Sequence, residues 1–256
     1  MSDVATPPEP KMEIHKPKPF HNWREFFKEV GIIVLGVAIA LAGEQGVEWL
    51  HNRHRAAQAG EGIRHEIAVG IGHMITRDKF EPCVSKRLDE IEGLIAAAAA
   101  GKLPPDSIWI GRPYYYALED SEYRTATQSG AADLLPDKER ATIATIYNAF
   151  NQYSQAEQRE QEAWSDLRVL EKHPAASPAL EWQLRSALQR ARTARWQEEA
   201  DSRAVAKTGA GALGIAAAPI FNFTIQSACI ALHTPRAKAE EMIVNGRTPR
   251  VTYDEP

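Results

Sequence analysis

Three histidines and one glutamate in a short stretch have the residue types best suited to binding a metal. They are His51, His54, Glu61 and His65. At 100° per residue they fall within about 80° of one another and share a helix face. An apolar stripe, Ile63, Ile67 and Met74, lies on roughly the opposite side, which favours a solvated polar face. One exposed stripe would hold a metal poorly, and we expect no metal there.

The segment Gly209–Gly214 spells G-x-G-x-x-G, the spacing of a dinucleotide-binding loop. Such a loop needs a preceding strand, so that backbone N–H groups meet a pyrophosphate at a helix N-terminus. Here a charged helical pattern precedes it, and no acidic residue follows about twenty positions later. We therefore expect a flexible linker and no cofactor.

Nucleophilic chemistry has no local signature in this sequence. There is no serine elbow, no H-E-x-x-H and no cysteine-protease motif, so we predict no catalytic residue. The best candidate for a ligand or partner patch is aromatic: Trp109, Tyr114, Tyr115, Tyr116 and Tyr123. Such rings can stack on a ligand or a partner protein, but more often they pin a long loop to a helical bundle.

The composition is that of an ordinary globular protein rich in helix formers. Of 256 residues, 44% are hydrophobic and 25% charged, and the net charge of -4 includes no basic block. Nucleic acid needs clustered Lys and Arg, so we expect none as a partner. Apolar residues recur at helical spacing, which predicts an all-α antiparallel bundle. The expected helices cover residues 56–80, a stretch after Pro82 to Ala100, 121–128, 137–171, 177–207 and 237–244.

An uncharged run, Val30–Gly43, predicts a membrane segment. Fourteen helical residues rise only about 21 Å, short of a hydrocarbon core of roughly 30 Å. Apolar flanks lengthen the run, and Trp23 and Trp49 lie about 39 Å apart, close to the spacing of the interfacial belts. We predict a disordered tail at 1–22, a transmembrane helix at 23–50 and a domain at 51–256.

The charges beside this helix predict its orientation. Five basic residues precede the uncharged run that begins at Val30, and only Arg53 and Arg55 follow within twenty residues of Gly43. The positive-inside rule then places the N-terminus in the cytoplasm of a bacterium and the domain in the periplasm. A cleaved signal peptide is the alternative, since Ala40–Ala42 offers a cleavage site, and it would export the same domain.

Two further membrane features remain open. The small residues Ala38, Ala42 and Gly46 lie four apart, which allows a homodimer of spanning helices. Residues 209–232 contain no charge and are long enough for a second span, but Pro219, Asn222 and Gln226 interrupt them. A buried segment on the bundle is the better expectation.

Two cysteines, Cys83 and Cys229, are the only ones. Neither has a C-x-x-C partner or a neighbouring His, and each lies among apolar residues. In an oxidising compartment such a pair is expected to form a disulfide, with two independent buried thiols as the alternative.

The N-terminal motifs resemble those of a known group of proteins. They are Met12–Pro19, Phe26–Glu29, Gly36 and Ala40–Gln45, with Ser129–Gly130, Leu135–Pro136 and Ile146–Tyr147 further along. About 70 residues are similar to uncharacterised membrane-anchored proteins of Gram-negative bacteria. The resemblance implies an anchor and no activity, and it makes Met12 a possible start.

Two classes of function fit these features. The first is a non-catalytic anchored module that binds a partner or ligand at the outer face of the inner membrane. The second is a periplasmic, hydrolase-like enzyme whose site assembles from scattered residues. A pocket lined by buried titratable groups would favour the enzyme.

Overall fold

The computed structural model describes residues 23–175, 177–220 and 226–246, and all regular structure there is helical. The predicted all-α class is confirmed. The predicted tail at 1–22 lies outside the described residues. The elements in chain order are α1 (Trp23–Ala99), α2 (Ser121–Gln128), η1 (Ala132–Leu134), α3 (Asp137–Leu167), η2 (Arg168–Lys172), α4 (Pro178–Leu213), η3 (Ser227–Cys229) and α5 (Arg236–Asn245), where η marks a 3₁₀ helix.

The chain divides into two compact units, residues 1–51 and 52–256. In the first unit, α1 carries an apolar stretch whose side chains are exposed; Ile32, Ile33 and Leu35 are each more than 60% exposed. Within the described residues, only α1 has a stretch long and apolar enough to cross a membrane. A spanning helix and a signal anchor share these properties, so both sequence expectations fit this helix.

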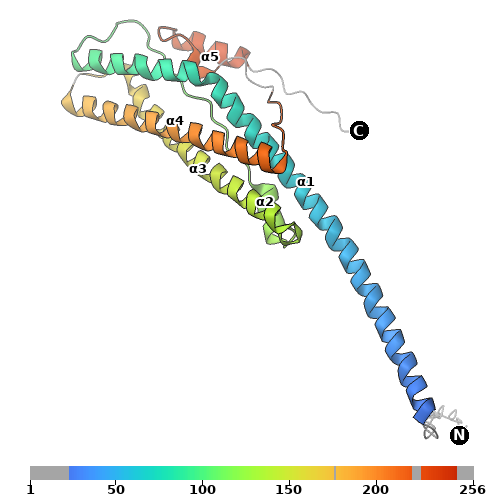
Figure 1. Ribbon diagram of the computed structural model, residues 1–256. Coiled ribbons are helices and arrows are strands. Elements are labelled where there is room, and N and C mark those ends of the chain that lie inside the picture. Colours follow the sequence, from blue (N-terminus) through green and yellow to red (C-terminus); the bar gives the residue numbers. More distant parts are fainter. Residues whose placement is uncertain (1–22, 176, 221–225, 247–256) are drawn as a thin grey trace, which may run out of the picture. The chain divides into compact units, whose positions relative to one another are not determined.

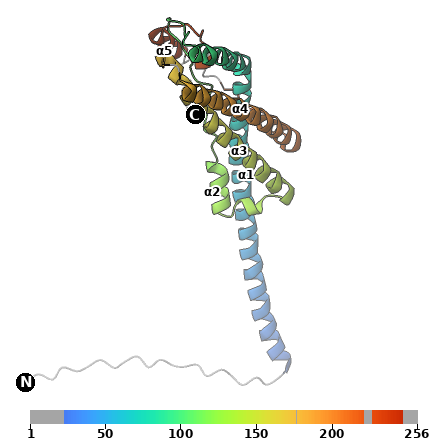
Figure 2. The same ribbon diagram turned by 90° about the vertical axis from the view of Figure 1, so that its left-hand side faces the viewer.

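In the second unit, α1 from Asn52 onward packs with α3 and α4 in a bundle (Figure 1 and Figure 2). Two apolar clusters form its interior. The Ile67 core joins Ile63–Met74 of α1 to Ile143–Tyr153 of α3 and to Val205. The Ile91 core joins Val84–Ala98 of α1 to Ala163–Leu167 and Leu184–Ala191. Each helix thus passes from one core to the other.

The expectation that Pro82 ends a helix is wrong, because α1 continues through it. Proline removes one N–H and crowds the preceding turn, which costs about 3 kcal/mol or more in a helix interior. Buried residues on both sides, Met74 and Val84, hold the helix against its neighbours. Figure 1 shows that α1 bends in this region, as expected at proline.

Local signals mark several other helix ends correctly. Ser177 caps α4 by accepting a hydrogen bond from the Leu180 backbone N–H (3.2 Å), and Pro178 occupies the first turn. Gly101, with φ of +66°, follows the end of α1, as expected for a terminating glycine. Asp137 begins α3 as its first residue and makes no capping bond; Pro136 precedes it.

The end of α4 corrects the linker prediction. Gly209–Leu213 forms the last turns of the helix instead of a flexible linker, and only Gly214 is left-handed, with φ of +65°. Gly209 lies on the Ile67 core, where an added Cβ would meet Ile71 Cδ1 at 2.9 Å. This glycine therefore allows two helices to approach closely.

The following segment lies directly on α1. The Ala218 N–H donates to the Ala68 carbonyl (2.8 Å), and a Cβ at Gly72 would lie 2.2 Å from the Ala218 carbonyl oxygen. Residues 214–220 are not helical, so the described part of 209–232 does not form a continuous spanning helix. Residues 221–225 lie outside the described part.

A carboxylate of α1 caps the short helix α2. Glu66 accepts hydrogen bonds from the Ser121 hydroxyl (3.0 Å), from the Glu122 and Tyr123 N–H groups (3.0 and 3.3 Å) and from the Tyr147 hydroxyl (2.5 Å). An isolated helix of eight residues is marginal in water, so this tertiary cap stabilises it. Burial tends to raise the pKa of Glu66, but these hydrogen bonds outweigh it and lower the pKa.

The irregular segment 107–112 and the segment 226–232, which contains η3, lie against α1 and each other. The Trp109 N–H donates to the Leu232 carbonyl (2.7 Å). Arg87 of α1 is buried and donates to the carbonyls of Trp109, Ile110 and Ile230. The pair Cys83–Cys229 forms a disulfide with a Cα–Cα distance of 5.2 Å, as predicted, and fastens the second segment.

Candidate functional site: a groove with basic rims

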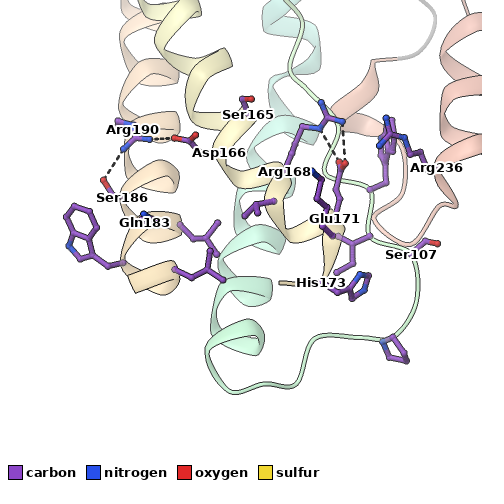
Figure 3. A pocket seen from close by; sticks show the side chains of 18 residues that line it. Ser107, Ser165, Asp166, Arg168, Glu171, His173, Gln183, Ser186, Arg190 and Arg236 are labelled. Atoms are coloured by element: carbon purple, nitrogen blue, oxygen red, sulfur yellow. Dashed lines mark hydrogen bonds and ion pairs between the residues drawn. The ribbon is translucent and has the colours of Figure 1, made fainter. Parts of the chain in front are cut away.

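A groove of about 970 Å³ lies between the end of α3, η2, the first half of α4 and the segment before Ile110 (Figure 3). Its lining includes four basic side chains, Arg168, Lys172, Arg190 and Arg236, and two carboxylates, Asp166 and Glu171. Its volume lies at the upper end of the usual range for ligand pockets. Basic groups therefore outnumber acidic ones in a groove that is large enough to bind a ligand.

Figure 3 places Arg190 and Arg236 on opposite sides, with Arg168 and Glu171 between them. Arg190 pairs with Asp166 (2.5 Å) and Arg168 with Glu171 (3.3 Å). Arg236 pairs with Glu240, outside the groove (2.8 Å). Among the described residues, Lys172 has no ion pair. It is the least neutralised cation of the groove.

The wall formed by residues 104–110 is held from two sides. His173 adopts a left-handed conformation with φ of 47°, and its Nε2 lies 2.9 and 3.1 Å from the Pro104 and Asp106 carbonyls. Glu171 accepts a hydrogen bond from the Ile110 N–H (3.1 Å). These contacts give the wall a defined shape before anything binds.

The predicted aromatic patch is distributed over several environments. Trp109 lines the groove and packs with Ile230 and Ala239. Tyr114 and Tyr116 contact His73 of α1, where the Tyr114 hydroxyl lies 2.5 Å from Nδ1. Tyr123 stacks on Tyr147, and Tyr115 is 53% exposed. Of these five residues only Trp109 belongs to the groove.

A second polar site is enclosed by the bundle. Arg77, Tyr153, Glu157, Glu160 and Glu198, here called the polar layer, are each at most 3% exposed. Along each helix the polar layer lies between residues of the Ile67 core and the Ile91 core. Arg77 donates to both carboxylate oxygens of Glu160 (2.9 and 3.1 Å), and its Nε lies 3.4 Å from Glu198.

Two buried glutamates, Glu160 and Glu198, thus share one buried arginine, and Glu157 lies in the same layer without an ion pair to it among the described residues. Burial raises the pKa of Glu157 to about 8. Burial, with the charge of Glu160 next in importance, raises the pKa of Glu198 well above its usual range. The pKa of Arg77 is raised: burial opposes this, but Glu160 and Glu198 outweigh it. Glu157 therefore retains its proton near neutral pH.

The four residues weighed as metal ligands, His51, His54, Glu61 and His65, are all exposed. The described residues contain no group of three or more His, Cys, Asp or Glu arranged to hold a metal ion. No family model, curated protein or solved structure matches this chain. Its function therefore has to be inferred from the groove and the elements around it.

Sequence reasoning missed most of the groove. Lys172, His173 and Pro174 signalled the end of a helix but not a site, because no spacing pattern links residues 105–109, 165–173, 180–190 and Arg236. The one available signal was Trp182, an apolar residue beside the cap of α4 that is 72% exposed.

Proposed function

We propose that the chain is a non-catalytic module, anchored in a bacterial inner membrane, that binds a partner in the groove on the periplasmic side. The groove is the observation that carries this proposal: it is large, built from four segments and edged by cations. The exposed apolar part of α1 supports the anchor, and the basic residues before it support a cytoplasmic N-terminus. The disulfide fits an oxidising compartment.

Binding is favoured over the hydrolase-like alternative by where the buried acids and bases lie. Glu157, Glu160, Glu198 and His73 are enclosed by the bundle, and none of them lines the groove. Catalytic groups need reach to a bound substrate. The likeness of the N-terminal motifs to anchored proteins of Gram-negative bacteria agrees with the membrane anchor.

The anchors can also pair, and we include this in the proposal. Gly46 has no atom within 4 Å of an added Cβ, and Ala38 and Ala42 are exposed on the same helix. Small residues at this spacing let two membrane helices approach closely. A dimer would place two grooves at one position on the membrane.

A photo-crosslinking amino acid at Gln183, which lines the groove, tests the binding function in intact cells. The matched control is Gln152, an exposed position on α3 outside the groove. We expect a discrete adduct from position 183 only. Equal labelling at both positions, or no adduct at 183 in cells where the protein is in the membrane fraction, would overturn the proposal.

A further inference from the structure

The floor of the groove is apolar. Ile108 and Leu184 are 5% and 2% exposed, and Val169 and Leu180 pack partly buried against the same Ile91 core. Trp182 is exposed at the edge of the same groove. Burying apolar side chains on such a floor is favourable, at about 25 cal/mol per Å². The floor therefore suits a partner with apolar side chains.

The rims suit negative charge at both ends of that floor. Arg190 stands on one side, and Arg168 and Arg236 stand toward the other (Figure 3). Lys172 also lines the groove and follows Glu171 in η2. The ion pair of Arg190 with Asp166 is roughly half exposed. Exposed pairs contribute at most about 1 kcal/mol, so an incoming carboxylate competes for Arg190 at little cost. Within the described part of the chain, Lys172 has no ion pair that it must give up before it binds a carboxylate.

The wall between the rims is main chain that belongs to no helix. Among the described residues, the backbone N–H and C=O groups of Ser107 and Ile108 have no hydrogen-bond partner. Trp109, the next residue, is fixed through Leu232 and Arg87. Free N–H and C=O groups on a fixed, non-helical segment can pair with an extended chain.

From these three features we infer that the groove binds an extended acidic segment of a partner protein. An apolar side chain of the segment lies on the floor of Ile108 and Leu184, and its main chain pairs with Ser107 and Ile108. Carboxylates on both sides of the apolar residue meet Arg190 at one rim and Lys172 with Arg168 at the other. This inference rests on the proposed function and names the chemistry of its partner.

The main chain of the wall favours a peptide over other anions. An anionic glycan or a lipid headgroup would use the arginines but not the paired N–H and C=O groups of Ser107 and Ile108. A bilayer surface is broad, whereas the charged residues here line a groove. Both other occupants are separate outcomes of the experiment.

The test measures binding of fluorescein-labelled synthetic heptapeptides to the full chain in detergent, by fluorescence anisotropy. The acidic probe is Glu-Asp-Leu-Val-Leu-Asp-Glu, and its neutral analogue replaces each acid by the corresponding amide. We expect the acidic peptide to bind at least about tenfold more tightly at low salt, with the difference shrinking as salt rises. Equal binding of the two would overturn the acidic class while leaving the groove as a binding site.

Matched variants locate the binding. Lys172→Glu should weaken the acidic peptide at least about fivefold, while Arg159→Glu, the same charge change on α3 outside the groove, should not. Trp182→Ala should weaken the binding of both peptides. Trp196→Ala, at a tryptophan outside the groove that is 62% exposed against 72% for Trp182, should weaken neither. If Lys172→Glu binds as tightly as the unchanged chain, the groove is not the site and the inference fails.

Vesicles containing phosphatidylglycerol and soluble peptidoglycan fragments complete the comparison. One contrary result is that either of these displaces the acidic peptide from the unchanged chain and loses its own binding in Lys172→Glu. That result would assign the groove to that anion and overturn the acidic-peptide inference. If neither heptapeptide binds but Gln183 gives its adduct in cells, the proposed function stands and the acidic-peptide inference falls. If Gln183 gives no adduct either, both fall.

Discussion

Glu157 of α3 is buried in the polar layer, where the Tyr116 N–H donates to one of its carboxylate oxygens (3.4 Å). Its other oxygen has no hydrogen-bond partner among the described residues. An ionised carboxylate in this position is costly, which is why burial raises the pKa of Glu157 to about 8. The protonated side chain, by contrast, is accommodated.

This gives a pH dependence with a definite sign. An acid whose pKa is higher folded than unfolded contributes stability at low pH and loses it as pH rises through the folded value. We expect the free energy of unfolding to fall between pH 4.5 and about 8, by up to about 1.4 kcal/mol per pH unit for one proton. Glu157→Gln should flatten this slope, measured by urea unfolding of the detergent-solubilised chain followed by circular dichroism.

Neighbouring acids also contribute to the pH slope, because burial raises the pKa values of Glu198 and Glu160 as well. Some slope should therefore remain in Glu157→Gln. Exposed Glu162→Gln serves as the control and should leave the slope unchanged. A slope that is as steep in Glu157→Gln as in the unchanged chain would show that Glu157 is ionised throughout this range.

Arg87 is a second residue whose role can be measured. It alone supplies hydrogen bonds to the carbonyls of Trp109, Ile110 and Ile230 from the α1 side. Arg87→Met keeps much of the side-chain volume but leaves three carbonyls without this donor, at about 1–3 kcal/mol for a buried polar group left unpaired. We expect a loss of about 3 kcal/mol or more in urea unfolding. Exposed Arg185→Met should lose less than about 0.5 kcal/mol.

At the scale of elements, two glycines of α1 predict opposite effects of the same substitution. At Gly72 an added methyl group meets the Ala218 carbonyl oxygen of the segment lying on the helix, whereas at Gly93 it meets nothing within 4 Å. Gly72→Ala should lower the unfolding free energy by about 1–3 kcal/mol, and Gly93→Ala should raise it by about 0.5–1 kcal/mol. Thermal unfolding of both variants decides this; two shifts of the same sign would contradict the packing at Gly72.

The difference between local backbone effects and tertiary packing also explains which helix ends could be predicted from the sequence. Ser177 with Pro178, and Gly101, act through their own backbone, so local rules locate them. Pro82 and Gly209 do not follow the local rules, because packing against neighbouring helices compensates for their poor intrinsic helix propensity. Tertiary contacts of this kind leave no local pattern.

The groove shows the same limit more strongly. Arg168, Lys172 and Arg190 look like charges on solvated helix faces, and they usually are. What makes them a site is the wall of Ser107 and Ile108, which Arg87 and residues 226–232 hold in place from distant parts of the chain. The cysteine pairing was accessible because only one pair exists.

For the molecule as a whole, the charge asymmetry around Val30–Gly43 predicts one crossing. A reporter enzyme that works only outside the cytoplasm, fused after Pro256, should be active, and one that works only inside should not. The protein should stay with membranes in high salt and leave them in detergent. Release by high salt would indicate a cleaved leader instead of an anchor.

The disulfide also acts on the whole domain, since its cysteines are 146 residues apart. In the chain-entropy account such a loop contributes about 5 kcal/mol, and removal of native disulfides costs about 2–5 kcal/mol. Reduction, or replacement of both cysteines by serine, should lower Tm. Alkylation without reduction, read by mass spectrometry, should leave both cysteines unlabelled; two labelled cysteines would show that the bond is absent.

The late position of Cys229 also determines when the domain can be finished. The wall of the groove depends on residues 226–232, which are synthesised after all three long helices. A chain threaded through a membrane from its N-terminus would deliver α1, α3 and α4 first. Arg87 could bond to the Ile230 carbonyl only after the last segment had followed. Folding would end only after translocation, at the moment when an oxidant joins Cys83 to Cys229. A partner could then meet the groove only on molecules whose export is complete.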